Sequence, residues 1–186
     1  MAYTSSQIVQ AVPTGINSAL VCVKAETAFT AVSSVTVDNV FTSSYTNYKI
    51  IIRYTSTTTT GNNLDFRLRA GGSSATGSNY NNSAMYADGS TASAFLDNSV
   101  SYWRIGQYTN TYNAVTNLDI FAPQLATPTV AINQQAANLG GYTTNRIYCN
   151  AFNHTLSTAY DGFELMVTSA GTHTGTYAVY GYGKSV

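Results

Sequence analysis

Strand-length runs with a two-residue hydrophobic period recur along this chain, and no run with a clear helical period separates them. The clearest is LDFRLRA (64–70), and YKIIIRY (48–54) and GFELMVT (162–168) show the same period. Because successive side chains of a strand point to opposite faces, these runs predict half-buried strands. We expect inward positions at Leu64, Phe66, Leu68 and Ala70, outward positions at Asp65, Arg67 and Arg69, and one shared face for Tyr48, Ile50, Ile52 and Tyr54.

The number and spacing of such runs predict an all-β fold. Further strand-like runs lie at 16–25, 29–37, 102–108, 115–122, 142–152 and 176–182. Roughly 8 to 10 strands without strand–helix alternation indicate a sandwich or barrel. Long irregular connections favour a jelly-roll-like antiparallel β-sandwich over an up-and-down barrel. Segment 71–101 is expected to hold short strands and long loops, and only 130–139 (VAINQQAANL) fits a short helix.

The chain length fits one domain with a short extension. Residues 1–15 have weak periodicity and end in a Pro-Thr-Gly turn signal, so we expect an N-terminal arm before a sandwich at 16–186. The arm lacks a basic start and a long apolar core, which argues against a signal peptide. No apolar run approaches the roughly 20 residues of a membrane helix, so no membrane partner is expected.

Charge is scarce: 8 Lys and Arg balance 8 Asp and Glu, and charged residues make up 9% of the chain. Nucleic-acid binders cluster cations against phosphates, so a nucleic-acid partner is not expected. A zero net charge also gives little colloidal repulsion, which favours a chain that lives in an assembly. Cys22 and Cys149 lie in strand-like runs without zinc-ligand spacing, which favours buried free thiols and leaves a disulfide open.

Candidate catalytic groups are few and dispersed. His154 and His173 lie in loop-like contexts and are best interpreted as turn histidines. Asp161 and Glu164 are the nearest carboxylates in sequence, but they flank a strand start, which suits a turn better than an acid–base pair. No phosphate loop, zinc motif or dinucleotide fingerprint occurs. We therefore expect no enzyme activity, no catalytic residues, no cofactor and no metal.

Two further groups of residues invite a binding interpretation. Arg67 and Arg69 on one strand face suit a salt-bridged surface better than an anion site. Segments 80–89 and 109–113 combine Tyr with Asn, and such side chains bind sugars but also build rigid loops and protein interfaces. The candidate glycan or partner contacts are Tyr80, Asn81, Asn82, Tyr86, Tyr108 and Tyr112.

A resemblance to a known family adds to this interpretation. The run NVFTSSYTNYKIIIRY (39–54), the strand LDFRLRAGG (64–72) and the ending GTYAVYGYGKS (175–185) resemble a family of tailed-bacteriophage virion proteins. The matching positions are Phe41, Thr42, Ser43, Tyr45, Asn47 and Tyr48, then Val179, Tyr180, Gly181, Tyr182 and Lys184. The resemblance covers about residues 25–185, and the middle third of the chain carries no such pattern.

The resemblance implies a jelly-roll module in a trimeric virion structural protein, without enzyme activity. We expect a homotrimeric decoration (cement) protein on the capsid surface, synthesised in the host cytoplasm, with the phage major capsid protein or other virion proteins as partners. Ile8, Val9 and Val12 are the expected capsid-anchoring contacts of the arm. The alternative is a tail-fibre or tail-knob module that recognises host-surface glycan through the Tyr/Asn residues. The sequence leaves head or tail location open.

Overall fold

The computed structural model describes residues 20–57, 62–88, 90–108, 113–138, 145–168 and 171–184, and every regular element in these ranges is a β-strand. The strands are β1 (Leu20–Val32), β2 (Ser34–Val37), β3 (Asn47–Ser56), β4 (Asn62–Ala70), β5 (Ser73–Ser74), β6 (Tyr80–Asp88), β7 (Thr91–Val100), β8 (Trp103–Tyr108), β9 (Ala114–Phe121), β10 (Thr129–Asn138), β11 (Asn145–His154), β12 (Gly162–Met166) and β13 (His173–Tyr182). The all-β prediction is confirmed.

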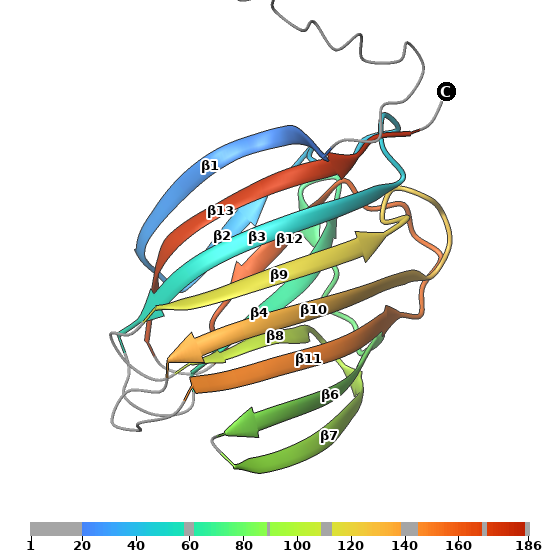
Figure 1. The fold of residues 1–186 in the computed structure, drawn as a ribbon. Helices are drawn as coiled ribbons and strands as arrows, with labels where there is room; N and C mark the ends of the chain where they lie inside the picture. Colours follow the sequence, from blue (N-terminus) through green and yellow to red (C-terminus); the bar gives the residue numbers. More distant parts are fainter. Residues whose placement is uncertain are drawn as a thin grey trace, which may run out of the picture.

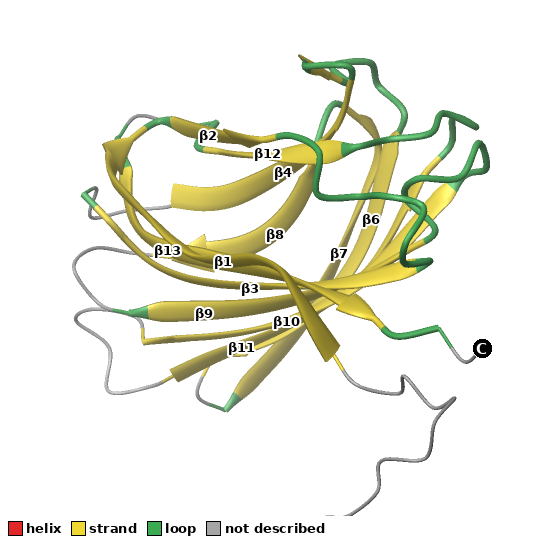
Figure 2. Ribbon diagram, turned by 90° about the horizontal axis from the view of Figure 1, so that it is seen from above, coloured by secondary structure: helices red, strands yellow, loops and turns green. Residues whose placement is uncertain are grey.

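The strands form two antiparallel sheets that face each other (Figures 1 and 2). The larger sheet runs β1-β13-β3-β9-β10-β11-β6-β7, and the smaller has β2, β12 and β4 in order, with β5 and β8 on the far edge of β4. Eight strands divide equally between the two sheets: β1, β13, β3 and β9 are neighbours in one, and β2, β12, β4 and β8 are neighbours in the other. This is the eight-stranded jelly-roll order, so the predicted jelly-roll-like sandwich is confirmed.

Two inserted hairpins enlarge this jelly roll. The hairpin β6–β7 is inserted in the sequence between β4 and β8, and the hairpin β10–β11 is inserted between β9 and β12. They join in space because β11 pairs with β6, and β10 pairs with β9. Together they extend the larger sheet by four strands beyond the jelly-roll order, as the lower part of Figure 1 shows.

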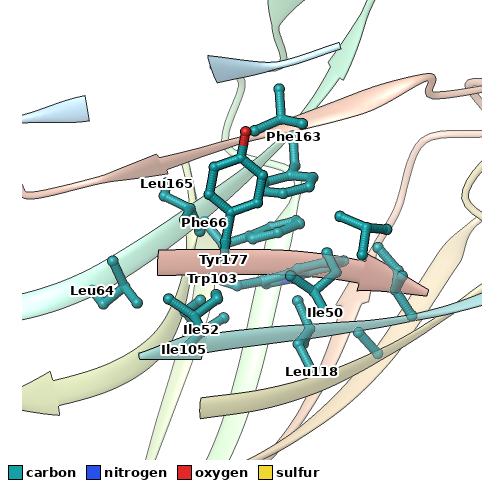
Figure 3. Close-up of a cluster of buried hydrophobic side chains, with 14 of the residues drawn as sticks. Ile50, Ile52, Leu64, Phe66, Trp103, Ile105, Leu118, Phe163, Leu165 and Tyr177 are labelled. Carbon is teal, nitrogen blue, oxygen red and sulfur yellow. The ribbon is translucent and has the colours of Figure 1, made fainter. Parts of the chain in front are cut away.

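An aromatic stack runs along the inner face of the smaller sheet, where Figure 3 labels Phe163, Phe66 and Trp103. Phe163, Phe66, Trp103 and Phe152 follow one another with ring centroids 5.2, 5.8 and 5.3 Å apart. Such pairs contribute about 0.5–1.5 kcal/mol beyond the burial of their area. Aliphatic side chains from both sheets, including those of Ile50 and Leu64, surround the stack. The stack therefore joins the smaller sheet to the inserted strand β11.

The predicted alternation holds in β3, where Tyr48, Ile50, Ile52 and Tyr54 are all buried. In β4 the inward side chains are buried as expected at Leu64, Phe66 and Leu68, with Ala70 half-buried, but the outward prediction needs correction. Asp65 and Arg69 are also buried. The turn after β7 lies over this face, because Arg67 Nε donates to the carbonyl of Ser101 at 2.9 Å. The second face of β4 is therefore covered rather than solvated.

One secondary-structure prediction is wrong, and one possibility that the sequence left open is not realised. The described part of segment 130–139 is not the short helix that its sequence fits: residues 129–138 form strand β10, whose inward positions include the amides Asn133 and Gln135. Segment 71–101 is not mainly loop, because it carries the long strands β6 and β7. In both segments the hydrophobic period is weak, and pairing with strands distant in sequence determines the secondary structure. The N-terminal arm, residues 1–15, lies outside the described residues.

Candidate functional site

The outer side of the inserted strands carries exposed apolar side chains. Met85 is 68% exposed, Leu96 64%, Ile147 56%, Ile132 50% and Val130 47%. We call this surface the apolar face; it consists of the outward residues Ser83, Met85, Ala87, Ala92, Ala94, Leu96, Val130, Ile132, Gln134, Ala136, Ile147, Cys149 and Ala151. Strand registry sets them side by side, since Cys149 lies opposite Met85 and Met85 lies opposite Ala94.

Two hollows of about 470 Å³ each indent the apolar face. The first has Met85, Cys149 and the small side chains of Ala87, Ala92 and Ala94 in its lining. The second lies toward β9 and β10, and its lining includes Val115, Gln134 and Ala136. Both hollows share Ala87 and Ile147. The face therefore has relief, with the branched side chain of Ile147 between two depressions.

No charged side chain points outward from the described residues of these four strands. Their charged residues are Asp88, Asp97 and Arg146, which lie on the inner side. There Arg146 pairs with Asp88, and Arg104 Nη1 of β8 lies 3.8 Å from Asp97 Oδ2. The charged side chains of these strands thus lie on the inner side together with aromatic rings, and the exposed outer side, which usually carries charge in soluble proteins, is apolar.

The inner side of the same strands holds a continuous series of rings and guanidinium groups. Arg146 lies 5.1 Å from the ring centroid of Tyr86, which stacks on Tyr148 at 5.4 Å. Phe95 follows at 5.8 Å from Tyr148, and Arg104 lies 5.6 Å from the ring of Phe95. Burial raises the pKa of Tyr148 to about 12, so its phenol stays neutral. We call this series the aromatic ladder.

Four of the six candidate glycan contacts, namely Tyr80, Asn81, Asn82 and Tyr86, lie in strand β6 and not in a loop. Tyr80 and Asn82 of β6 point inward and are buried. The Tyr80 hydroxyl donates to the carbonyl of Ala75 at 2.9 Å and accepts from the Leu68 N–H, so its role is structural. Asn82 donates to Asp97 at 3.1 Å, and Asn81 donates to Asn153 at 2.8 Å.

Of these candidates, Tyr86 alone is seen with a half-buried ring, and it belongs to the aromatic ladder. Tyr108 ends β8, but its side chain lies outside the described part of the structure, as does all of Tyr112. The four candidates whose side chains are described therefore do not form one surface, because Tyr80 and Asn82 are buried. Their predicted role in ligand contact stays a prediction.

The two histidines are buried in strands and are not in exposed turns. His154 ends β11, and its Nδ1 lies 3.2 Å from the Tyr160 hydroxyl. His173 begins β13, and its Nε2 lies 3.2 Å from the carbonyl oxygen of Asn63. Burial lowers the pKa of both imidazoles. Each histidine thus fills a neutral structural position at one end of its strand.

The carboxylates also serve local structure. Asp161 accepts the Gly71 N–H at 3.0 Å, and Glu164 lies 3.9 Å from an Arg67 guanidinium nitrogen. Burial raises the pKa of Asp65 to about 7, and the Thr168 hydroxyl donates to this carboxyl group. In the described ranges, no group of three or more His, Cys, Asp or Glu side chains could hold a metal ion.

Both cysteines have free thiols, but they are not equally buried. Cys22 of β1 is exposed, so the prediction of a buried thiol is wrong there. Cys149 of β11 is half-buried and lies on the apolar face. The two thiols therefore lie on strands far apart in the larger sheet, because β1 forms one edge and β11 belongs to the inserted hairpins.

Two of the three sequence segments that carry the virion-protein resemblance, 39–54 and 175–185, meet in space. Tyr48 pairs in register with Gly181, and the Tyr45 ring covers the Gly181 backbone. Lys184 Nζ donates to the carbonyl of Ser43 at 2.7 Å. Thr42 N–H donates to the Tyr48 hydroxyl at 2.6 Å. These motif residues thus form one junction between the start of β3 and the end of β13.

Comparison of the chain with protein-family models, with curated proteins and with solved structures finds no match. The described residues contain no helix long and apolar enough to cross a membrane. Ile8, Val9 and Val12, the expected anchoring contacts, lie outside the described residues.

Proposed function

We propose that this chain is a non-enzymatic structural protein of a bacteriophage virion, a homotrimer that decorates the capsid surface. The observation that carries the assembly role is the apolar face. Large exposed apolar patches on soluble proteins mark interaction sites. Here the patch covers four adjacent strands with large side chains at 47–68% exposure, so a neighbouring subunit has a continuous surface to cover.

The virion context rests on the resemblance of the motif segments. Residues of two of these segments, 39–54 and 175–185, form one packed junction, so this part of the resemblance concerns a structural unit of the fold. The low charge of the chain agrees with a permanently assembled particle, in which neutral faces are covered. The phage major capsid protein is the proposed partner, and the arm with Ile8, Val9 and Val12 is the proposed anchor.

A split co-sedimentation experiment tests this function. Labelled protein is mixed separately with undecorated phage capsids and with host bacteria. Saturable binding to capsids alone, at a fixed copy number per shell, is the expected result. A variant lacking residues 2–14 should lose capsid binding and keep its fold, and undiminished capsid occupancy by that variant would exclude the arm as anchor. Binding to cells alone would contradict the decoration role.

The aromatic ladder favours a second candidate function, recognition of host-surface glycan by a tail knob. Tyr86 and Phe95 present half-buried rings beside Arg104 and Asp97, and rings with planar polar groups suit sugar stacking and hydrogen bonding. Tyr86→Ala should then abolish binding to host cells, while Ser83→Ala on the opposite side of β6 should not. Equal cell binding by both variants would exclude the ladder as that site.

A further inference from the structure

We infer that copies of this chain meet through the apolar face, so that a second copy of the same chain covers Met85, Ile132 and Ile147. This inference rests on the proposed assembly function and adds to it the contact surface. The jelly-roll order is complete without the inserted hairpins, whose outer side is left without a partner in the described chain.

The relief of the face suits an apolar partner of the same kind. Ile147 and Met85 project from the surface, while Ala87, Ala92 and Ala94 leave a hollow between them. Close packing requires branched side chains to enter such depressions, as in protein interiors. A second copy brings both the projecting side chains and the hollows, so each copy can fill the depressions of the next.

The charge distribution favours a second copy over a charged partner. The outward positions of the four strands carry no charge within the described residues, so like faces do not repel each other. Five cations of the chain are already paired internally: Lys49, Arg67, Arg69, Arg104 and Arg146. A strongly acidic or basic protein would therefore gain little electrostatic energy on this surface.

The size of the face is sufficient for specific association. Four strands spaced about 4.8 Å apart span about 20 Å, and seven or eight residues along a strand span about 25 Å. The face therefore offers roughly 500 Å² per copy, or about 1,000 Å² counted over two copies, which is the lower bound for a specific interface. Association at micromolar concentration is the expected strength.

The two native thiols provide a direct test, because Cys149 lies on the apolar face and Cys22 lies on the opposite edge strand of the sheet. Both are labelled with a maleimide over a series of protein concentrations, and each site is quantified by mass spectrometry. Self-association should slow Cys149 labelling at least about tenfold from nanomolar to tens of micromolar protein, because labelling then requires dissociation. Cys22 labelling should not change.

A matched pair of variants separates this surface from apolar exposure in general. Ile147 is 56% exposed on the apolar face, and Leu156 is 44% exposed in the loop after β11. Ile147→Asp should weaken association roughly 30-fold or more, because a charge is buried at the centre of the contact. Leu156→Asp should leave association unchanged. Circular dichroism and the melting temperature confirm folding, and Met85→Asp serves as the second variant if Ile147→Asp unfolds.

The outcomes distinguish this inference from the proposed function. If light scattering shows an oligomer whose Cys149 stays reactive and whose mass is insensitive to Ile147→Asp, the copies meet elsewhere, and only the surface assignment is wrong. If the chain is a monomer at tens of micromolar with both thiols reactive, the surface and the homotrimer are both excluded. A monomer with protected Cys149 would likewise overturn the second copy as the occupant.

Discussion

At the scale of single residues, Gly181 is a position of the resemblance motif that has no room for a side chain. A Cβ at this position would lie 2.3–2.5 Å from three ring carbons of Tyr45. We expect Gly181→Ala to reduce the free energy of unfolding by about 1–3 kcal/mol, because the ring must move from a packed position. Urea unfolding of the purified variant measures this loss.

The control for this residue is a double-mutant cycle. Tyr45→Ala removes the ring that the new Cβ would meet, so the double variant should be more stable than the sum of the two single losses predicts. Additive losses would mean that the destabilisation does not come from the Tyr45 contact.

Three buried titratable groups make the stability of the fold depend on pH. Burial lowers the pKa of His154 and His173 from 6.5, so the unfolded chain binds protons there more readily as the pH falls below that value. Stability is thereby lost by up to about 1.4 kcal/mol per pH unit for each histidine. Burial raises the pKa of Asp65 from 3.8 to about 7, so this carboxyl adds stability as the pH falls through that interval.

The histidines and Asp65 therefore act in opposite directions on the urea midpoint as the pH is lowered from about 6 to about 5. Asp65→Asn removes the stabilising contribution, because its amide does not titrate, so its midpoint should decrease with falling pH relative to that of the unaltered protein. His173→Gln removes one destabilising contribution, so its midpoint should increase relative to that of the unaltered protein over the same interval. A midpoint with the same pH profile in all three proteins would show that these groups do not control acid stability.

At the scale of elements, amide side chains replace a missing neighbour of strand β8. This strand pairs with β4 along one edge, and Gln135 of β10 serves the other edge. Gln107 N–H donates to Gln135 Oε1 at 3.0 Å, and Gln135 Nε2 donates to the Gln107 carbonyl at 2.9 Å. Asn133 Nδ2 and the Thr116 hydroxyl both donate to the carbonyl of Ile105. The free edge of β8 is thereby closed without another strand.

Loss of the Gln135 side chain should reduce the free energy of unfolding far more than loss of the neighbouring Gln134 side chain. Gln135→Ala leaves both backbone groups of the half-buried Gln107 without this partner and should lower the free energy of unfolding by about 2–4 kcal/mol. Gln134 is exposed on the apolar face, so Gln134→Ala should change it by less than about 0.5 kcal/mol. Thermal unfolding of dilute protein compares the two, and equal losses would exclude an edge-closing role for Gln135.

A comparison of strands β3 and β10 shows how far the sequence predicts the fold. In β3, apolar residues alternate inward because the core covers one side only, and that period is visible in the sequence. In β10 the inward positions include the amides Asn133 and Gln135, and the outward ones include Val130 and Ile132, so the hydrophobic period is misleading. The apolar face depends on pairing between distant hairpins. Its one local signal is the absence of charged residues and His from 120–145.

At the scale of the whole molecule, two roles are divided between two parts of one larger sheet. The jelly-roll strands β1, β13, β3 and β9 pack against the smaller sheet, while the inserted hairpins turn apolar side chains outward. Because both hairpins are inserted in connections between jelly-roll strands, they add a surface without changing the strand order of the jelly roll. We interpret the inserted hairpins as the assembly part of the molecule.

This division predicts how self-association responds to salt. The five ion pairs of the described residues lie within one chain, and the apolar face carries no charge among its described residues. Salt screens exposed charges strongly but leaves apolar burial intact or slightly strengthened. The dissociation constant from sedimentation equilibrium should therefore change by less than about threefold between about 0.05 M and about 0.5 M NaCl. A tenfold weakening would indicate that ionic contacts, and not the apolar face, hold the copies together.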